Sequence, residues 1–313
     1  MTDAFYRNAA SAQSTYSLQR DPKMNTRQVS PATTEPLVYI ILLNWNGWPD
    51  TLQCLESLGN LAYTNYRILV IDNGSTDDSV ERLRNSDHGI RLMENGENLG
   101  FAKACNVGIR EALREGAEYA WLLNNDTVVG PSALRALVGR AEQDRRVGGV
   151  GSVVYYLDKP EQVQAWGGGY VNFWLGHSRH FTSRVSEQKV GFITGASLLL
   201  SGRALSEIGL LDEQFFMYWE DADWAFRLKR AGWRLAVAEK SVVWHKESAA
   251  VGRSSPRLDT YFNTSAVRFF RKNAPLPMFS VWSGVGLRLL KRMIFRDWVR
   301  VRAVWRGVRI ANG

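Results

Sequence analysis

The stretch from Ala120 to Thr127, with the sequence AWLLNNDT, constrains the fold of this chain most strongly. Its unbroken apolar start predicts a buried strand that is covered on both faces. Ligands collect at the carboxyl ends of strands in open α/β sheets, so the polar residues that follow are candidates for a binding site. Asp126 offers a hard oxygen to Mg²⁺ or Mn²⁺, and Asn124 and Asn125 add donors and acceptors. Taken alone, the stretch also fits a solvated turn between a strand and a helix.

Three further apolar runs, at residues 37–43, 67–71 and 90–93, precede this stretch and alternate with helical patterns. This alternation predicts an α/β fold with a mainly parallel sheet and helices on both faces. Polar clusters end three of the strands, and parallel strands would place them along one edge of the sheet, which suits a nucleotide. Ser75 with Asp78 fits a helix capping box. The clusters are Asn44 with Asn46, Asp72 with Asn73, and Asn124 with Asp126.

Beyond residue 145 the pattern predicts strands at 150–156 and 192–200 and a helix that runs from Asp221 to Gly232. Two more strands are expected at 234–238 and 241–244, and His245 ends the second. The glycine-rich residues 164–170 lack the context of a dinucleotide-binding fingerprint. The predicted organisation is a disordered leader, a catalytic domain in two parts and a basic amphipathic helical tail, at residues 1–35, 36–255 (36–130 and 131–255) and 256–313.

Composition places the chain among globular proteins of ordinary hydrophobicity. The 313 residues are 45% hydrophobic and 22% charged. Cys54 and Cys105 show no metal-binding spacing and no disulfide framework, which indicates a reducing compartment. We expect no signal peptide and no membrane-spanning helix, because no run is apolar over roughly 18 residues. These features exclude the disulfide-rich secreted class and the multi-span membrane class.

The net charge of +8 is concentrated at the C-terminal end. From Arg268 onwards, eleven basic residues face a single acid, Asp297, so this segment carries +10 and the rest carries −2. Trp282, Trp298 and Trp305 lie between the arginines, and tryptophan beside basic residues is typical of interfacial helices. We therefore predict peripheral binding to an anionic membrane, in preference to nucleic acid or a solvated helix face.

Six motifs, in order, resemble the family 2 glycosyltransferases of the GT-A fold, within the rhamnosyltransferase-like group. The resemblance spans about residues 37 to 250. The family's metal motif is often Asp-x-Asp, whereas this chain has Asn-Asn-Asp, a form found in the rhamnosyltransferase-like branch. The motifs are ILLNWN at 41–46, VIDNGSTD at 70–77, NLGF at 98–101 with Asn106, LLNNDT at 122–127, EDAD at 220–223, and His245.

The resemblance implies an inverting transferase that moves a sugar from a nucleoside-diphosphate sugar to a lipid-linked or polysaccharide acceptor. It implies dTDP-L-rhamnose as the first donor candidate and a UDP-sugar as the second, with Mg²⁺ or Mn²⁺. The enzyme would act in cell-surface glycan synthesis at the inner face of the membrane. The implied general base is Asp221, with Glu220 as the alternative. Asp126 and His245 would bind the metal.

The remaining site residues are assigned by the resemblance at Asp72 and by side-chain chemistry at the others. Asp72 would accept a hydrogen bond from the imide N–H of uracil or thymine, and Trp166 and Trp219 would stack on the acceptor. The other residues expected to contact the donor are Asn44, Asn46, Asn73, Asn98, Lys103, Asn124 and Asn125. Each role has a structural alternative, such as an Asx turn at Asp72, a helix cap at Asp221 or core packing of the tryptophans.

Two other functions fit parts of this pattern. A sugar-phosphate nucleotidyltransferase also has a nucleotide-binding α/β sheet. Enzymes of that class share a glycine-rich, arginine-containing loop after the first strand. Here that loop is Asn44-Trp45-Asn46-Gly47, which argues against it. The second is a non-catalytic protein with a degenerate transferase domain that binds membrane or nucleic acid.

Overall fold

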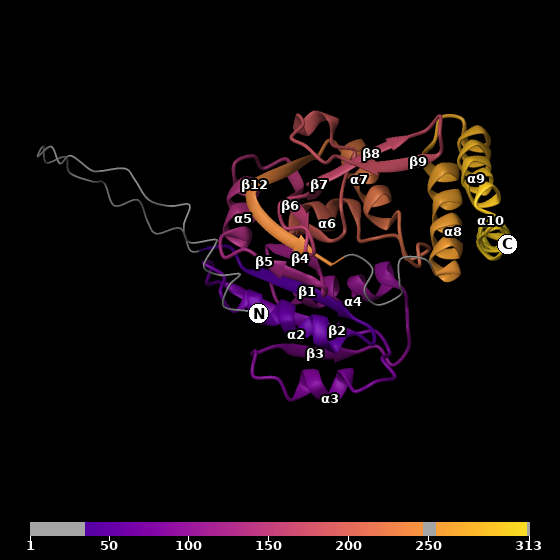
Figure 1. Cartoon of the computed structure of the whole chain (residues 1–313). Helices are drawn as coiled ribbons and strands as arrows, with labels where there is room; N and C mark the ends of the chain where they lie inside the picture. Colours follow the sequence, from indigo (N-terminus) through magenta and orange to yellow (C-terminus); the bar gives the residue numbers. More distant parts are fainter. Residues whose placement is uncertain (1–34, 247–254, 312–313) are drawn as a thin grey trace, which may run out of the picture. The chain divides into compact units, whose positions relative to one another are not determined.

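The computed structural model describes residues 35–246 and 255–311, and Figure 1 shows their fold. Of the predicted leader, only Glu35 is described. Within the described residues the main sheet has nine strands, with β7 paired to β6 beside the order β3-β2-β1-β4-β11-β6-β12-β5. Six of these strands share one direction, so the sheet is mixed but mainly parallel, as predicted.

Four parallel strands make up one half of the main sheet. Their apolar, β-branched sequences fit a sheet that is covered on both faces. The register pairs Asn44 with Asp72 and Leu43 with Asn124, so the polar ends of the strands lie along one edge, as the sequence predicted. The strands are β1 (Val38–Asn44), β2 (Tyr66–Asp72), β3 (Arg91–Glu94) and β4 (Tyr119–Asn124).

The other half of the sheet contains the strands with opposite direction. The prediction of two separate strands at 234–238 and 241–244 is wrong: they form one strand, β12, with a register shift between Ala238 and Val242. Residues 239–241 bulge out of the ladder with β6, which resumes at Val242. The strands are β5 (Thr127–Val129), β6 (Val147–Tyr156), β7 (Val163–Trp166), β11 (Ser197–Ser201) and β12 (Arg234–His245).

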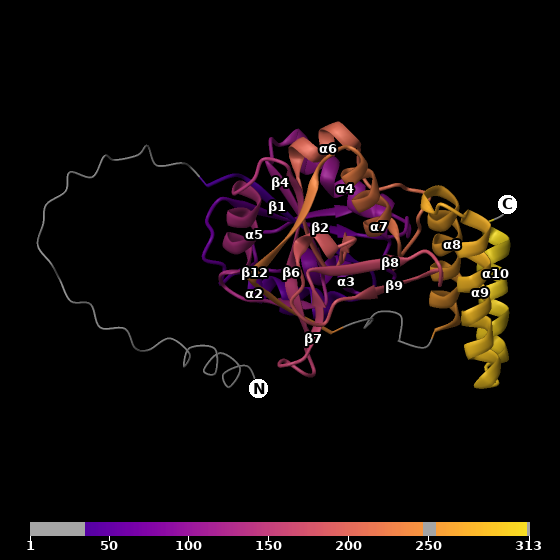
Figure 2. The same ribbon diagram turned by 90° about the horizontal axis from the view of Figure 1, so that it is seen from above.

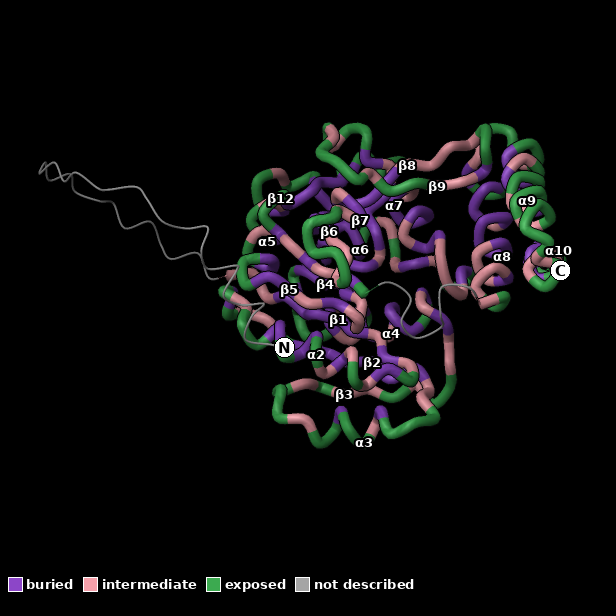
Figure 3. Tube along the Cα trace, viewed as in Figure 1, coloured by how far each residue is buried: buried purple, intermediate pink, exposed green. Residues whose placement is uncertain are grey.

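Helices cover both faces of this sheet, as Figure 3 shows by the burial of the central strands. Alternate residues of β1 enter different cores: Ile41 packs with α4, α6 and α7, whereas Leu42 packs with α2, α3 and α5. The helices are α2 (Trp48–Leu58), α3 (Ser79–Arg84), α4 (Phe101–Arg114), α5 (Ala133–Glu142), α6 (Gly202–Ile208) and α7 (Glu220–Arg230).

The glycine-rich run begins in β7 of the main sheet, and its glycines lead into a small antiparallel sheet of order β10-β8-β9. A Cβ atom on Gly168 would lie 1.9 Å from the Phe192 carbonyl oxygen, and one on Gly169 would lie 2.0 Å from that of Arg179. Close strand contact therefore accounts for these glycines. The strands are β8 (Gly168–Asn172), β9 (His177–His180) and β10 (Phe192–Ile193), and the short 3₁₀ helix Glu187–Lys189 precedes β10.

The segment predicted as a tail is helical, and Figure 2 shows its three helices side by side. Its first helix contributes Phe269 and Phe270 to the core shared with α7. Asp259 accepts hydrogen bonds from Arg292 and Arg300, which ties the three helices together. They are α8 (Pro256–Asn273), α9 (Pro277–Ile294) and α10 (Trp298–Ile310).

Candidate active site

A cavity of about 510 Å³ opens at the carboxyl edge of the main sheet. Nine of the predicted site residues line this cavity, and five others, Asn44, Asn46, Asp72, Lys103 and Trp166, lie outside its lining. Strands, the start of α7 and helix α8 all contribute to its wall, so the sequence-distant motifs meet here. The nine are Asn73, Asn98, Asn124, Asn125, Asp126, Trp219, Glu220, Asp221 and His245.

The turn after β2 is held by hydrogen bonds among its own side chains. The buried Asp72 carboxylate accepts from Asn44 Nδ2 at 2.9 Å, from Ser75 Oγ at 2.6 Å and from the Ser75 backbone N–H at 2.9 Å. Asn46 accepts from the Thr76 N–H at 2.7 Å. Ser75 therefore braces Asp72 and does not form the predicted capping box, since α3 begins at Ser79 without a side-chain cap from Asp78.

The loop that follows β3 is also held by hydrogen bonds of nearby side chains. Asn73 Oδ1 accepts from the Leu99 N–H at 3.0 Å, and its Nδ2 donates to Asn98 Oδ1 at 3.0 Å. Gly100, at φ +80°, lies so close to Phe216 that a Cβ would be 2.4 Å from the Phe216 carbonyl oxygen. This glycine is required where the NLGF motif meets the loop before α7. Lys103 lies in the first turn of α4, and its side chain is exposed.

His245, at the end of β12, is clamped between two amides and a carboxylate. Its Nδ1 lies 2.8 Å from Gln164 Oε1, which can only accept, so Nδ1 carries the proton. Its Nε2 lies 3.1 Å from both Asn124 Nδ2 and Asp126 Oδ1. With Nδ1 protonated, Nε2 is an acceptor for Asn124 Nδ2, and the Asp126 carboxylate oxygen lies at the same distance from it.

This pair fits a divalent cation. Two ligands about 2.1 Å from an octahedral ion and at right angles are about 3 Å apart, close to the observed Asp126–His245 distance. Within the described ranges no cluster of three or more His, Cys, Asp or Glu side chains could hold a metal. Water and phosphate oxygens would therefore have to complete the coordination shell, as Mg²⁺ commonly allows.

Asp221 and Glu220 open helix α7, and both side chains line the cavity. Asp221 Oδ2 accepts from the Gly195 N–H at 3.1 Å, and Oδ1 accepts from the Ala222 N–H at 2.7 Å. Trp219, at φ +71°, is the N-cap residue, so Asp221 lies inside the first turn rather than at the cap. Burial raises the pKa of Asp221 to about 6, and the backbone N–H donors oppose this rise.

Glu220 is in a more apolar environment than its neighbour. Its Oε2 has no hydrogen-bond partner among the described residues, and the side chain is buried. Burial, together with the Asp221 charge, raises its pKa well above the ordinary value. Two adjacent carboxyl groups with different surroundings can hold different protonation states, and Asp221 is the one that ionises first.

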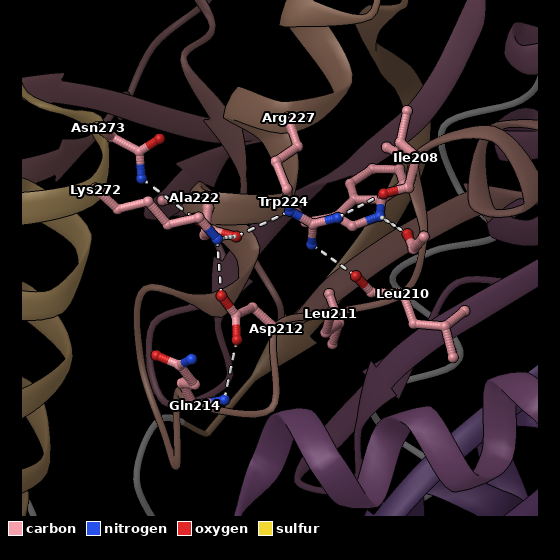
Figure 4. Close-up of polar contacts among 12 residues, drawn as sticks. Ile208, Leu210, Leu211, Asp212, Gln214, Ala222, Trp224, Arg227, Lys272 and Asn273 are labelled. Carbon is pink, nitrogen blue, oxygen red and sulfur yellow. Dashed lines mark hydrogen bonds and ion pairs between the residues drawn. The ribbon is translucent and has the colours of Figure 1, made fainter.

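A buried ion network fixes α7 against α8, as Figure 4 shows. Asp223 is fully buried and accepts from Arg227 at 3.0 Å, Lys272 at 2.9 Å and Asn273 at 3.2 Å. Arg227 also donates to the carbonyl oxygens of Ile208 and Leu210. Because Asp223 lies two residues beyond Asp221, the network sets the position of the catalytic turn.

Aromatic residues form the wall beside α7. Trp219 is 4% exposed and packs against Phe262, Phe269 and Phe270, with only part of the ring facing the cavity. Trp166 ends β7 and lies outside the lining. Sequence reasoning missed Gln164, which no motif marks, and the α8 residues Leu258 and Phe262, which it assigned to the tail.

The mixed, mainly parallel sheet with a cavity at its carboxyl edge is the arrangement of the GT-A fold. The chain belongs to glycosyl transferase family 2, whose sequence profile matches residues 39–209. Its fold is similar to that of the mannosyltransferase PcManGT from Pyrobaculum calidifontis, solved with GDP-Man and Mn²⁺. That comparison has a TM-score of 0.59, 18% identity, and covers 89% of this chain and 88% of the other.

Two curated relatives carry rhamnosyl names. The N-acetylglucosaminyl-diphospho-decaprenol L-rhamnosyltransferase of Mycobacterium tuberculosis is 28% identical over 240 residues, which cover 68% of this chain and 77% of the relative. The dTDP-rhamnosyl transferase RfbF of Shigella flexneri is 22% identical over 195 residues, covering 62% of this chain and 64% of the relative. The prediction of a family 2 glycosyltransferase with a GT-A fold is confirmed.

Proposed function

We propose that this glycosyltransferase moves L-rhamnose from dTDP-L-rhamnose to a lipid-linked or growing polysaccharide acceptor, with a UDP-sugar as the second donor candidate. The rhamnosyl names of the two curated relatives support the sugar. The observation that carries the proposal is one cavity whose lining includes both the Asp126–His245 pair and Asp221. Such a cavity can hold a diphosphate and a base on either side of a sugar.

The proposed chemistry is a single inverting displacement. The acceptor hydroxyl oxygen forms a bond to the anomeric carbon while the bond from that carbon to the diphosphate oxygen breaks. Asp221, ionised above its pKa of about 6, takes the hydroxyl proton, and the nucleoside diphosphate leaves with the bonding electrons. The N–H groups of Gly195 and Ala222 hold the Asp221 carboxylate in place.

Asp126 and His245 would hold Mg²⁺ or Mn²⁺, which supplies positive charge to the departing diphosphate. Gln164 accepts from His245 Nδ1 and so would present Nε2 to the ion, which would replace the contact of Nε2 with Asn124 Nδ2. Asn125 is held by Thr51 at 2.8 Å, which keeps its amide at the cavity wall.

For the nucleotide we propose the turn after β2 as the base-recognition element. Asp72 Oδ2 accepts one described hydrogen bond and keeps a lone pair for an imide N–H of thymine or uracil. Asn44 and Asn46 hold this turn from β1, and Asn73 with Asn98 forms the wall beside it. Lys103 is proposed as a diphosphate contact, although its side chain lies outside the lining.

For the acceptor we propose the aromatic wall of the cavity, formed by Trp219, Tyr218 and Phe262. Aromatic faces suit the apolar C–H faces of sugars. Trp166 is proposed to contact an extended acceptor beyond the cavity. The unpaired, buried Cys54 and Cys105 fit the proposed location at the inner, cytoplasmic face of the membrane.

A donor panel tests this proposal. Purified protein is mixed with dTDP-L-rhamnose, UDP-sugars and GDP-sugars, with Mg²⁺, Mn²⁺ or EDTA, and nucleoside diphosphate release is measured. We expect release from dTDP-L-rhamnose only with metal. Equal release with EDTA would refute the metal role, and release from a UDP-sugar alone would move the proposal to that donor. Pyrophosphate release from a sugar phosphate and a nucleoside triphosphate would show a nucleotidyltransferase instead.

A further inference from the structure

Large exposed apolar side chains are gathered in one part of the described chain. All fifteen of them fall in two segments, the tip between β8 and β9 and residues 276–310. No other described segment carries any, so they differ from the scattered apolar residues that most protein surfaces have. We call them the apolar face: Trp174, Leu175, Leu276, Met278, Phe279, Trp282, Leu287, Leu290, Met293, Ile294, Phe295, Trp298, Val299, Trp305 and Ile310.

Helix α9 is apolar on its buried and on its exposed side. Val281, Val285 and Leu289 are buried, whereas Trp282 and Leu290 lie on the outward side at helical spacing. Green exposed stretches along the outer sides of α9 and α10 mark this surface in Figure 3. Large apolar side chains gathered on the exposed side of a helix mark a surface that contacts a protein or a lipid phase.

The apolar face continues at both ends of α9. At its start, Phe279 packs edge-on against Trp174 at 5.7 Å, so the β8–β9 tip joins the face. At its end, Ile294, Phe295, Trp298 and Val299 are between 58% and 73% exposed around the turn to α10. None of the described helices is both long and apolar enough to cross a membrane. A helix flanked by two apolar corners suits a position in the plane of an interface.

The charges around the apolar face are basic. Arg302, Arg306 and Arg309 are exposed on α10 between Trp298, Trp305 and Ile310. The two acidic residues of α8–α10 are already engaged: Asp259 binds Arg292 and Arg300, and Asp297 caps α10 at the Arg300 N–H. A second copy of this chain would therefore set positive charge against positive charge, whereas anionic lipid would complement it.

We propose that the apolar face is an in-plane docking surface for an anionic lipid bilayer, with α9 lying in the headgroup region. The inference rests on the proposed function, because it places the cavity beside a lipid-linked acceptor. Helix α8 links the two sites: its Leu258 and Phe262 line the cavity, and its other side holds Thr264 against Gly307 of α10.

The test is flotation of the full-length protein with vesicles of phosphatidylcholine alone and of phosphatidylcholine mixed with phosphatidylglycerol. We expect binding to the mixed vesicles that weakens with salt. Exchanging Arg302, Arg306 and Arg309 for Gln should lower the partition coefficient on mixed vesicles roughly a hundredfold. The charge-matched control exchanges Arg67, Arg145 and Arg230, which are exposed on the sheet domain, for Gln and should retain binding.

A second variant tests the apolar contribution. Phe295→Ser with Trp298→Ser should lower binding by roughly tenfold or more while keeping the steep salt dependence, because only buried apolar area is lost. Circular dichroism and the unfolding midpoint of each variant should match the unaltered protein, since these side chains are exposed.

Three results would overturn the docking surface. They are equal flotation of all variants, a lipid-free dimer that the Phe295/Trp298 variant abolishes, and tighter binding to DNA than to the mixed vesicles. Donor hydrolysis in detergent-free buffer separates this inference from the proposed function. Flotation without hydrolysis of any nucleotide sugar defeats the proposed function alone, and hydrolysis without flotation defeats the docking surface alone.

Discussion

The residues around Asp72 and those around His245 and Glu220, both at the carboxyl edge of the main sheet, differ in how their polar groups are satisfied. On the nucleotide side, Asp72 shares its carboxylate with Asn44 and Ser75, so the polar groups satisfy one another. On the side proposed to be catalytic, Nε2 of His245 lies beside the Asp126 carboxylate, and Glu220 Oε2 has no partner among the described residues. The first arrangement is a preorganised frame, whereas the second brings together groups to which a cation, a proton or a substrate can bind. The difference indicates where binding should change the protein most.

The largest effect should come from removing the carboxylate on the catalytic side. Asp126→Ala takes away an oxygen ligand and leaves His245 alone, so we expect transfer to fall below detection while the unfolding midpoint changes little. Asp87→Ala, which removes an exposed carboxylate on the nucleotide side, serves as the control. Radiolabelled sugar transfer measures the effect, and activity within a few-fold of the unaltered enzyme would exclude Asp126 as a ligand.

The next effect concerns the base. Asp221→Asn keeps the shape and one acceptor oxygen but cannot take a proton, so turnover should fall by about 10² to 10⁴ with little change in donor affinity. In the unaltered enzyme, turnover should drop tenfold for each pH unit below about 6, because the raised pKa of Asp221 protonates the base there. A profile that is flat from pH 5 to roughly pH 8 would assign the proton transfer to another group.

A smaller effect should follow from loss of the histidine support. Gln164→Leu leaves His245 Nδ1 without its acceptor, so the Mn²⁺ concentration for half-maximal activity should rise about 10- to 100-fold. Turnover should recover at saturating Mn²⁺, which a general folding defect would not allow. Gln162→Leu, on the exposed turn before β7, is the matched control. A fall in turnover without a change in the Mn²⁺ requirement would contradict the positioning role.

The smallest effect on catalysis should come from a change near Asp72 and Asn44, on the proposed nucleotide side of the cavity. Thr51 is buried, donates to Asn44 Oδ1 at 2.9 Å and accepts from Asn125 at 2.8 Å. Thr51→Val should lower the free energy of unfolding by about 1–3 kcal/mol, because the buried Asn44 amide and the half-buried Asn125 amide lose a partner. The Mn²⁺ requirement should not change. Urea unfolding of this variant and of exposed Thr76→Val gives the comparison, and equal stabilities would show that the bonds are replaced by water.

Sequence reasoning predicted the sheet well because its strands are unbroken apolar runs that end in polar residues. The register that pairs Asn44 with Asp72 follows from parallel strands of similar length. Sequence reasoning could not find Gln164, because no local sequence pattern shows that a residue of one strand will bind a histidine on another strand. It also treated α8 as part of a tail, because charge and tryptophan content do not reveal that Phe269 and Phe270 are buried against α7.

The central claim is that the catalytic half of the edge is completed by a cation held by Asp126 and His245. Calorimetric titration of the unaltered protein with dTDP, with Mn²⁺ and with EDTA, tests it most directly, and Asp126→Ala is titrated in parallel. We predict that Mn²⁺ tightens dTDP binding by about tenfold or more in the unaltered protein and has no effect in the variant. Equal dTDP affinity with Mn²⁺ and with EDTA in the unaltered protein would contradict the claim.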